Sequence, residues 1–361
     1  MIPLVKVGMP DKKILMSELE KVLYSGMIAE GEKVYDFEYQ FSKMFGLSNA
    51  IAMSSGTAAL HASLILSGVS PGDEVITTSM TAEPTNISIL HVGAVPVFAD
   101  VDPLSGNLSP SSIRKKISSK TKAIIVVHYA GIPARMSEIM KISKEFNIPV
   151  IEDCAHSLGA QYDNKGIGTI GDFGIFSFQA IKHMTTVDGG FLVMKDKHLI
   201  NKAKRFRWFG LEKGIPRSEL NISDIGYKYN MTNVTAVIGL SQLSAIESRI
   251  ARHKENGYFF DSNIPQVSGL TVPKFEKCAI PSYWLYTIFS DDYQNVQKCL
   301  NDIGVSASKL HKPNHLHSIF NASDIPLPNL DYYYKRMIHI PCGWWVKEED
   351  RENILDALKK G

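Results

Sequence analysis

The residue most informative about chemistry is Lys182, which follows Ser177 by five positions and precedes the double glycine Gly189-Gly190. We expect the apolar stretch 173–178 before it to be a buried strand. A lysine at the end of such a strand is poorly solvated, and this favours its neutral, nucleophilic amine. A nucleophilic lysine suits Schiff-base chemistry and predicts an enzyme that uses pyridoxal 5′-phosphate (PLP). The alternative, an ordinary surface lysine, is disfavoured by the residues described next.

A phosphate-binding turn is predicted near residue 56. The apolar stretch 50–53 indicates a short buried strand, and an alanine-rich helix begins at about Ala58. Gly56 and Thr57 lie in the turn between them. Backbone amides at a helix start bind an anion, and a glycine lets the ligand approach closely.

An acidic residue suited to the PLP ring stands at the end of another apolar strand, 148–151, which runs into Glu152 and Asp153. A carboxylate in this place pairs with the pyridine nitrogen and keeps it protonated, so that the ring accepts electrons from the substrate. We therefore expect Asp153 to be the electronic partner of Lys182. The alternative is a purely local capping role.

Apolar strands and helical stretches alternate along the chain, which predicts an α/β fold with a mostly parallel central sheet flanked by helices. Ligands bind such sheets at the carboxyl ends of the strands. A helical stretch at about 232–256 links a large domain, 1–248, to a smaller α+β C-terminal domain, 249–361. The predicted strands are 74–78, 95–99, 123–127, 150–152, 173–178, 190–194 and 283–289, and the clearest predicted helices besides the link are 136–146 and 348–360.

Composition excludes several classes of protein. The 361 residues are 44% hydrophobic with a formal charge of +2, and the basic residues are scattered, so we expect no nucleic-acid partner. No segment is apolar enough for a membrane span. The four cysteines form no CxxC pair, which favours reduced thiols in a cytoplasmic protein. His311, His315 and His317 lack a supporting carboxylate or cysteine cluster, so no metal site is expected.

The chain resembles the DegT/DnrJ/EryC1/StrS family of PLP-dependent nucleotide-sugar aminotransferases, which have the fold-type I architecture of the aspartate aminotransferase superfamily. The resemblance covers nearly the whole chain, and the order and spacing of its segments are specific. These segments are 26–31, 54–60, 71–75, 93–102, 152–160, 176–190, 226–231 and 238–243.

The resemblance implies a role for each matching residue near the cofactor. Lys182 falls on the Schiff-base lysine, and Asp153 on the partner of the ring nitrogen. His156 takes the place near the phenolic oxygen of the ring. The family pattern also implies that three residues hold the phosphate, and these are Gly56, Thr57 and Ser177.

Two departures from the family pattern stand out. Ala82 occupies a position where many relatives carry an aromatic residue that stacks on the PLP ring. Lys228 and Asn230 stand where Asn and Arg are usual in a motif that reaches the phosphate of the neighbouring subunit. The resemblance thus implies a homodimer with shared active sites, in which a lysine meets the phosphate as a point charge.

Three histidines are candidates for contacts with the substrate. His183 follows the lysine, although alternation along an extended segment would point it away from its neighbour. The resemblance places His311 and His317 in a loop near the substrate. A structural role remains the alternative for His183.

The resemblance implies transfer of an amino group from an amino acid, glutamate in most relatives, to a keto group of a nucleotide-linked deoxysugar, in surface-polysaccharide or glycoconjugate biosynthesis. One alternative acceptor is a small phosphorylated or cyclitol ketone, because every cofactor residue would be the same. An alternative reaction is PLP-dependent sugar dehydration. Relatives that catalyse it carry histidine in the Schiff-base position, so Lys182 argues against it. A non-catalytic protein of the same fold is least favoured. The sugar, its carbon, the nucleotide and the stereochemistry depend on loop geometry.

Overall fold

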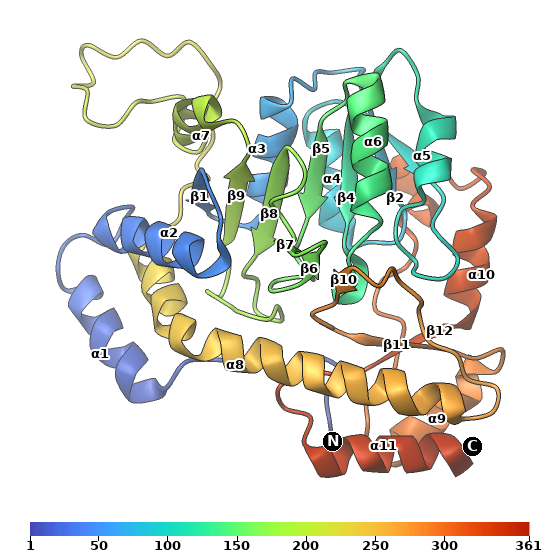
Figure 1. The fold of residues 1–361 in the computed structure, drawn as a ribbon. Coiled ribbons are helices and arrows are strands. Elements are labelled where there is room, and N and C mark those ends of the chain that lie inside the picture. The colour runs from blue at the N-terminus through green and yellow to red at the C-terminus, as the bar shows by residue number, and fades with distance from the viewer. Residues whose placement is uncertain (361) are drawn as a thin grey trace.

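The computed structural model describes residues 1–360 and has a central sheet of seven strands (Figure 1). The strand order is β1-β9-β8-β5-β4-β2-β3, and β9 alone runs antiparallel to its neighbours in this sheet. The mostly parallel sheet predicted from the alternation of strands and helices is confirmed. The strands are β1 (Ala50–Met53), β2 (Glu74–Thr78), β3 (Val95–Ala99), β4 (Thr121–Val127), β5 (Val150–Asp153), β8 (Phe173–Ser177) and β9 (Gly190–Met194).

Helices cover both faces of the sheet because the strands are apolar on both sides. In β5, Val150 packs into the core on one face and the next residue, Ile151, packs into the core on the other. The first face is covered by α2 (Glu32–Phe45), α5 (Pro110–Lys116), α6 (Met136–Phe146) and α8 (Asn233–Asn263), and the second by α3 (Gly56–Leu66), α4 (Glu83–His91) and α7 (Ile200–Phe206). α1 (Lys12–Leu23) packs against α8.

The predicted strands agree with the observed ones except at the last. The predicted stretch 283–289 forms strand only from Tyr286, where β11 (Tyr286–Phe289) begins. Tyr283 has a left-handed backbone, with φ of 46°, and strand pairing cannot accommodate this conformation. The segment before β11 therefore belongs to a tight connection, and it borders the site described below.

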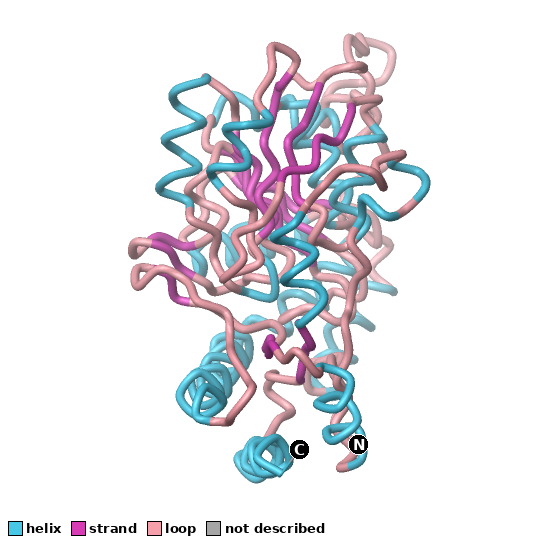
Figure 2. Tube along the Cα trace, turned by 90° about the vertical axis from the view of Figure 1, so that its right-hand side faces the viewer, coloured by secondary structure: helices cyan, strands magenta, loops and turns pink. Residues whose placement is uncertain are grey.

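The C-terminal part builds its own core on a two-stranded sheet of β11 and β12 (Met337–Ile340). In Figure 2 the two ends of the chain lie away from the large sheet, and Ile2 forms a bridge with Val305. The helices of the C-terminal part are α9 (Tyr293–Asp302), α10 (Pro328–Arg336) and α11 (Glu348–Lys360). A separate three-stranded sheet contains β6 (Gln161–Tyr162), β7 (Lys165–Gly166) and β10 (Ala279–Ile280).

The predicted boundary residue, Ser248, lies inside α8, which is 31 residues long. One continuous helix therefore connects the two predicted domains, and the division at this residue stays a prediction. Within residues 1–360, no helix combines the length and the apolar character that a membrane crossing requires. The four cysteines are all unpaired.

Candidate active site

A cavity of about 330 Å³ lies at the carboxyl ends of the parallel strands. Val127, Asp153 and Ser177 are the last residues of β4, β5 and β8, and all three line it. This is the edge at which parallel sheets bind ligands. The structure brings most of the sequence-predicted site residues together around this cavity: Gly56, Thr57, Asp153, His156, Ser177, Lys182 and His311.

Lys182 lies in the turn that follows β8, and its backbone amide donates a hydrogen bond to Gln179 O at 3.0 Å. Burial lowers the pKa of its amine to about 8, although the carboxylate of Asp153 acts in the opposite direction. With this pKa, about a tenth of the amine is neutral at pH 7, far more than for a lysine at its ordinary pKa. A larger neutral fraction is what a nucleophilic lysine requires, and the role of Lys182 stays a prediction.

Asp153 ends β5 and is buried, with 3% of its surface exposed. Thr85 Oγ1 donates to Oδ2 at 2.8 Å, and the amide of Ala155 donates to Oδ1 at 3.1 Å. Burial raises the pKa of the carboxyl, while these two hydrogen bonds and the charge of Lys182 counteract the rise. Sequence reasoning missed Thr85, because only the packing of α4 against the end of β5 reveals its contact with Asp153.

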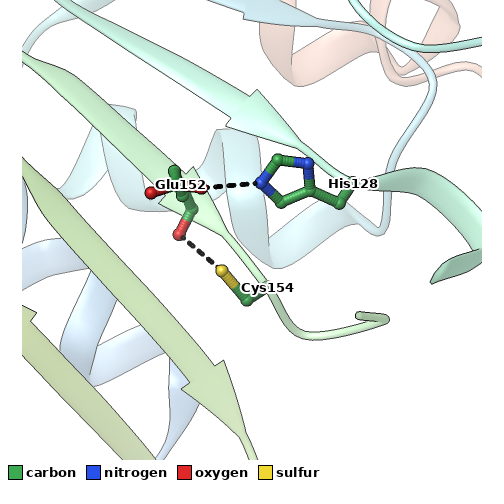
Figure 3. A group of neighbouring side chains, drawn as sticks. All are labelled: His128, Glu152 and Cys154. Atoms are coloured by element: carbon green, nitrogen blue, oxygen red, sulfur yellow. Dashed lines mark hydrogen bonds and ion pairs between the residues drawn. The ribbon is translucent and has the colours of Figure 1, made fainter. Parts of the chain in front are cut away.

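Glu152 anchors β5 directly beside Asp153 (Figure 3). It is fully buried, and His128 Nε2 donates to its Oε2 at 3.1 Å. Since His128 Nδ1 accepts a hydrogen bond from the amide of Ala134, Nε2 carries the proton in the neutral ring. The carboxylate also accepts hydrogen bonds from three backbone amides, those of Gly168, Ile170 and Gly171, at 3.1, 2.7 and 2.6 Å.

This cluster also contains Cys154, and it is the one group among residues 1–360 with the proximity of ligand atoms that a metal site needs. The oxygens of Glu152 are occupied by hydrogen-bond donors, and the Cys154 thiol points to the backbone oxygen of Glu152 at 3.5 Å. Burial raises the pKa of this thiol well above its usual value, so it stays protonated. We interpret the cluster as a structural support for the end of β5.

The start of α3 forms the anion-binding part of the cavity. Ser55 caps the helix, since its Oγ accepts a hydrogen bond from the amide of Ala58 at 3.0 Å. A Cβ on Gly56 would lie 2.9 Å from the Cβ of Ser177, so only glycine lets the helix start approach β8 this closely. Gly56, Thr57 and Ser177 thus lie together where the helix dipole favours a phosphate.

His156 borders the cavity and stacks on Trp284, with ring centroids 3.9 Å apart and an angle of 20° between the planes. Burial holds the pKa of this histidine well below its usual value, so the ring is neutral. Its Nδ1 is buried and has no hydrogen-bond partner within residues 1–360.

Four of the predicted residues do not line the cavity. His183 is buried on the other side of the turn, where Nε2 donates to Ser282 O at 3.1 Å and the ring lies 4.5 Å from that of His253. His317 lies 3.8 Å from Glu83, which does line the cavity and also lies 3.9 Å from His311.

The other two, Lys228 and Asn230, belong to the segment after α7. Lys228 is exposed, and its Nζ lies 3.8 Å from the centroid of the Trp208 ring. Asn230 is buried; its Nδ2 donates to Met231 O at 3.4 Å, and its Oδ1 has no partner among the described residues. Neither residue therefore reaches the cavity of its own chain.

The residues around the cavity fit PLP on three independent observations. The helix start and Gly56 form a cradle that a side chain would fill. The unpartnered Nδ1 of His156 suits the phenolic oxygen of the ring. A buried carboxylate, Asp153, faces a lysine of lowered pKa across the same cavity. Ala82 also lines the cavity, so the position of the usual stacking residue is occupied by a methyl group.

Comparison with known proteins agrees with this geometry. Residues 11–359 match the sequence profile of the DegT/DnrJ/EryC1/StrS aminotransferase family. GDP-perosamine synthase of Escherichia coli O157:H7 is 34% identical, over 88% of this chain and 84% of the enzyme. The sugar aminotransferase CalS13 from Micromonospora echinospora superposes with a TM-score of 0.95 at 32% identity over the whole of both chains. The PLP form of Spr1654 from Streptococcus pneumoniae has a TM-score of 0.88 at 26% identity, over 99% of this chain and 98% of Spr1654.

Proposed function

The chain belongs to the DegT/DnrJ/EryC1/StrS aminotransferase family and is a PLP-dependent aminotransferase, and we propose that its acceptor is a keto group on a nucleotide-linked deoxysugar. The observation that carries this proposal is the assembly of Lys182, Asp153 and the phosphate cradle around one cavity. The similarity to GDP-perosamine synthase and to the sugar aminotransferase CalS13 supports a sugar acceptor. The product would supply surface-polysaccharide or glycoconjugate biosynthesis.

Each of these residues of the cavity would bind a different part of PLP. Lys182 would form the covalent link, and Asp153 would pair with the ring nitrogen. The start of α3 with Ser177 would hold the phosphate, and His156 would donate to the phenolic oxygen. When bound, PLP supplies an electron-withdrawing ring that makes the hydrogen next to the substrate nitrogen acidic.

Lys182 is also the base that would move this proton. Its pKa of about 8 lies near neutral pH, so the free amine can accept a proton and return it with little energetic bias. Asp153 stays ionised when it faces a protonated ring nitrogen, because an opposite charge favours the carboxylate. The lysine would thus carry the mobile proton, and the ionised aspartate would keep the ring nitrogen protonated.

The position of Lys182 supports amino transfer over sugar dehydration. Relatives that dehydrate sugars carry histidine in the Schiff-base position. Here Lys182 lines the cavity, whereas the adjacent His183 packs against His253. A small phosphorylated or cyclitol ketone stays the alternative acceptor, and turnover of each class of ketone distinguishes the two.

We further propose glutamate as the amino donor and a homodimer with shared active sites. Lys228 and Asn230 do not line the cavity of their own chain, and the segment that precedes them extends away from the sheet (Figure 1). Three apolar side chains of this segment are exposed: Ile215, Ile222 and Ile225. Burial of these side chains against a second copy would bring Lys228 and Asn230 to the partner's phosphate. Sedimentation of the wild type tests the dimer, and a cytoplasmic location stays a prediction.

The deciding experiment is the absorbance spectrum of the purified protein with and without glutamate. We expect a visible PLP band in the wild type, which glutamate converts to the pyridoxamine form. Lys182→Ala should lose the band of the covalent link, whereas Lys195→Ala, at an exposed position beyond β9, should retain it. A wild type that binds no PLP would refute the enzyme assignment. PLP binding without a response to glutamate would refute the donor.

A further inference from the structure

Trp284 contacts two residues of the cavity although it comes from the C-terminal half of the chain. It lies in the connection between β10 and β11, and only 2% of its surface is exposed. The Nζ atom of Lys182 lies 4.1 Å from the centroid of its indole ring. The same indole stacks on His156 at 3.9 Å. One aromatic side chain therefore supports both the amine and the histidine beside it.

The backbone around Lys182 is attached to the same connection. Trp284 Nε1 donates a hydrogen bond to the carbonyl of Ile181 at 2.9 Å. His183 Nε2 donates to the carbonyl of Ser282 at 3.1 Å. The residues on both sides of Lys182 are thus bonded to the segment 282–284.

The segment 282–284 is itself held firmly. The amide of Ser282 donates to Gly131 O at 2.9 Å, and His253 Nδ1 donates to Tyr283 O at 2.9 Å. A Cβ on Gly131 would lie 2.7 Å from the amide nitrogen of Trp284, so the backbone segments around these two residues are in close contact. The left-handed backbone of Tyr283 is costly, and it persists because these contacts determine it.

An indole face attracts a cation through the negative charge above its ring. The titratable groups around the amine are Asp153, which carries a negative charge, and three histidines, His156, His183 and His311. Burial lowers the pKa of each histidine, so none of the three competes as a cation near neutral pH. The indole is the uncharged surface on which the lysine amine rests in this structure.

We propose that Trp284 is a positioning residue that holds the amine of Lys182 against its ring face whenever the lysine is not linked to PLP. A lysine side chain has several rotatable bonds, and a fixed resting place keeps its amine beside the cavity during the proton transfer. The inference rests on the proposed role of Lys182. It adds a function for a residue outside the cofactor contacts already described.

The test compares three variants with the wild type, and all four proteins are first freed of PLP. Dinitrofluorobenzene reacts with neutral amines, and peptide mass spectrometry gives the pH midpoint of labelling at Lys182. In W284L the indole face is lost while the site stays apolar, so the midpoint should fall by about half to one pH unit. W284F retains an aromatic face and should show a smaller fall. W344L removes an indole that faces Lys6 and Arg249, outside the cavity, and should leave the midpoint unchanged.

A second readout separates this role from simple stabilisation. With PLP bound, W284L should lower kcat about tenfold with little change in the KM for glutamate, since the substrate contacts remain. An unchanged or raised midpoint in W284L, or equal midpoints in W284F and W284L, would overturn the inference. If borohydride reduction of the wild type fails to link PLP to Lys182, the proposed role of this lysine is wrong, whatever the midpoints show, and the inference is overturned with it.

Discussion

Replacing Thr85 with valine should weaken the enzyme through Asp153, although Thr85 itself carries no charge. Its hydroxyl donates to Asp153 Oδ2 at 2.8 Å and therefore accepts the second hydrogen bond, of 2.9 Å, from the hydroxyl of Thr81. All three residues are buried. Valine has nearly the same shape as threonine, so the substitution keeps the packing while it removes the donor to Asp153 and the acceptor for Thr81.

The size of the effect follows from the loss of one hydrogen bond to a buried carboxylate, which is about 1.5–3 kcal/mol. This loss penalises the ionised form of Asp153 and raises its pKa further, by about one to two units at 1.36 kcal/mol per unit. Asp153 then pairs less well with the ring nitrogen. If the whole loss is felt in the transition state, kcat falls by up to about a hundredfold.

The assay is the single-turnover reaction of the PLP enzyme with glutamate, measured for Thr85→Val and for Thr85→Ser. The serine variant retains a hydroxyl and should recover most of the rate. Equal rates for the two variants would refute the role of the hydroxyl, and so would a rate for Thr85→Val that equals the wild type.

The unfolding free energy of the PLP-free protein provides a second measurement. Because the pKa of Asp153 is raised in the folded state, its carboxylate opposes folding at neutral pH. Thr85→Val should therefore lose about 1.5–3 kcal/mol at pH 7. The loss should shrink as the pH falls through the raised pKa of Asp153 in the folded variant, and it should vanish below the pKa of Asp153 in the folded wild type, where the carboxyl is protonated in both proteins. A loss that is independent of pH would show that packing and not charge is responsible.

Three further predictions concern other parts of the site. The rate at which PLP attaches to Lys182 in the PLP-free protein should rise about tenfold per pH unit up to about 8 and then level off, because burial lowers the pKa of the amine to this value; a flat profile would contradict it. Gly56→Ala should weaken PLP binding at least about tenfold in a spectroscopic titration, since its Cβ would lie 2.9 Å from that of Ser177. Gly166→Ala, whose Cβ would meet its nearest atom at 3.7 Å, is the matched control and should bind PLP normally. Glu152→Gln should destabilise the protein by about 3 kcal/mol in urea unfolding, because an amide cannot accept every hydrogen bond of a buried carboxylate; an unchanged midpoint would refute the anchoring of β5.

The local chemistry of the site is readable from the sequence because it depends on residues that are close in the chain. A strand followed by a glycine turn and a helix predicts the phosphate cradle at Gly56, and the end of an apolar strand predicts Asp153. Lys182 follows Ser177 at a short spacing in one turn. Parallel strands then bring these three segments to the same edge of the sheet, so their meeting follows from the fold class.

The surroundings of those residues depend on contacts between distant parts of the chain. Thr85 meets Asp153 across 68 positions, and Trp284 meets Ile181 across 103 positions. No periodicity or spacing predicts these contacts, because the first forms when α4 packs against the end of β5 and the second when the C-terminal part docks on the large sheet.

The positions of the histidines likewise could not all be predicted from the sequence. His156 and His311 line the cavity, whereas His183 turns away from it, although His183 is next to Lys182 in the chain. The sequence by itself determined the fold class, the cofactor and the segments that meet at the cavity, because each is encoded by residue type and position within one strand or turn. Only the tertiary structure decided what supports Lys182 and Asp153, because a pKa and a side-chain orientation depend on neighbours that are distant in sequence.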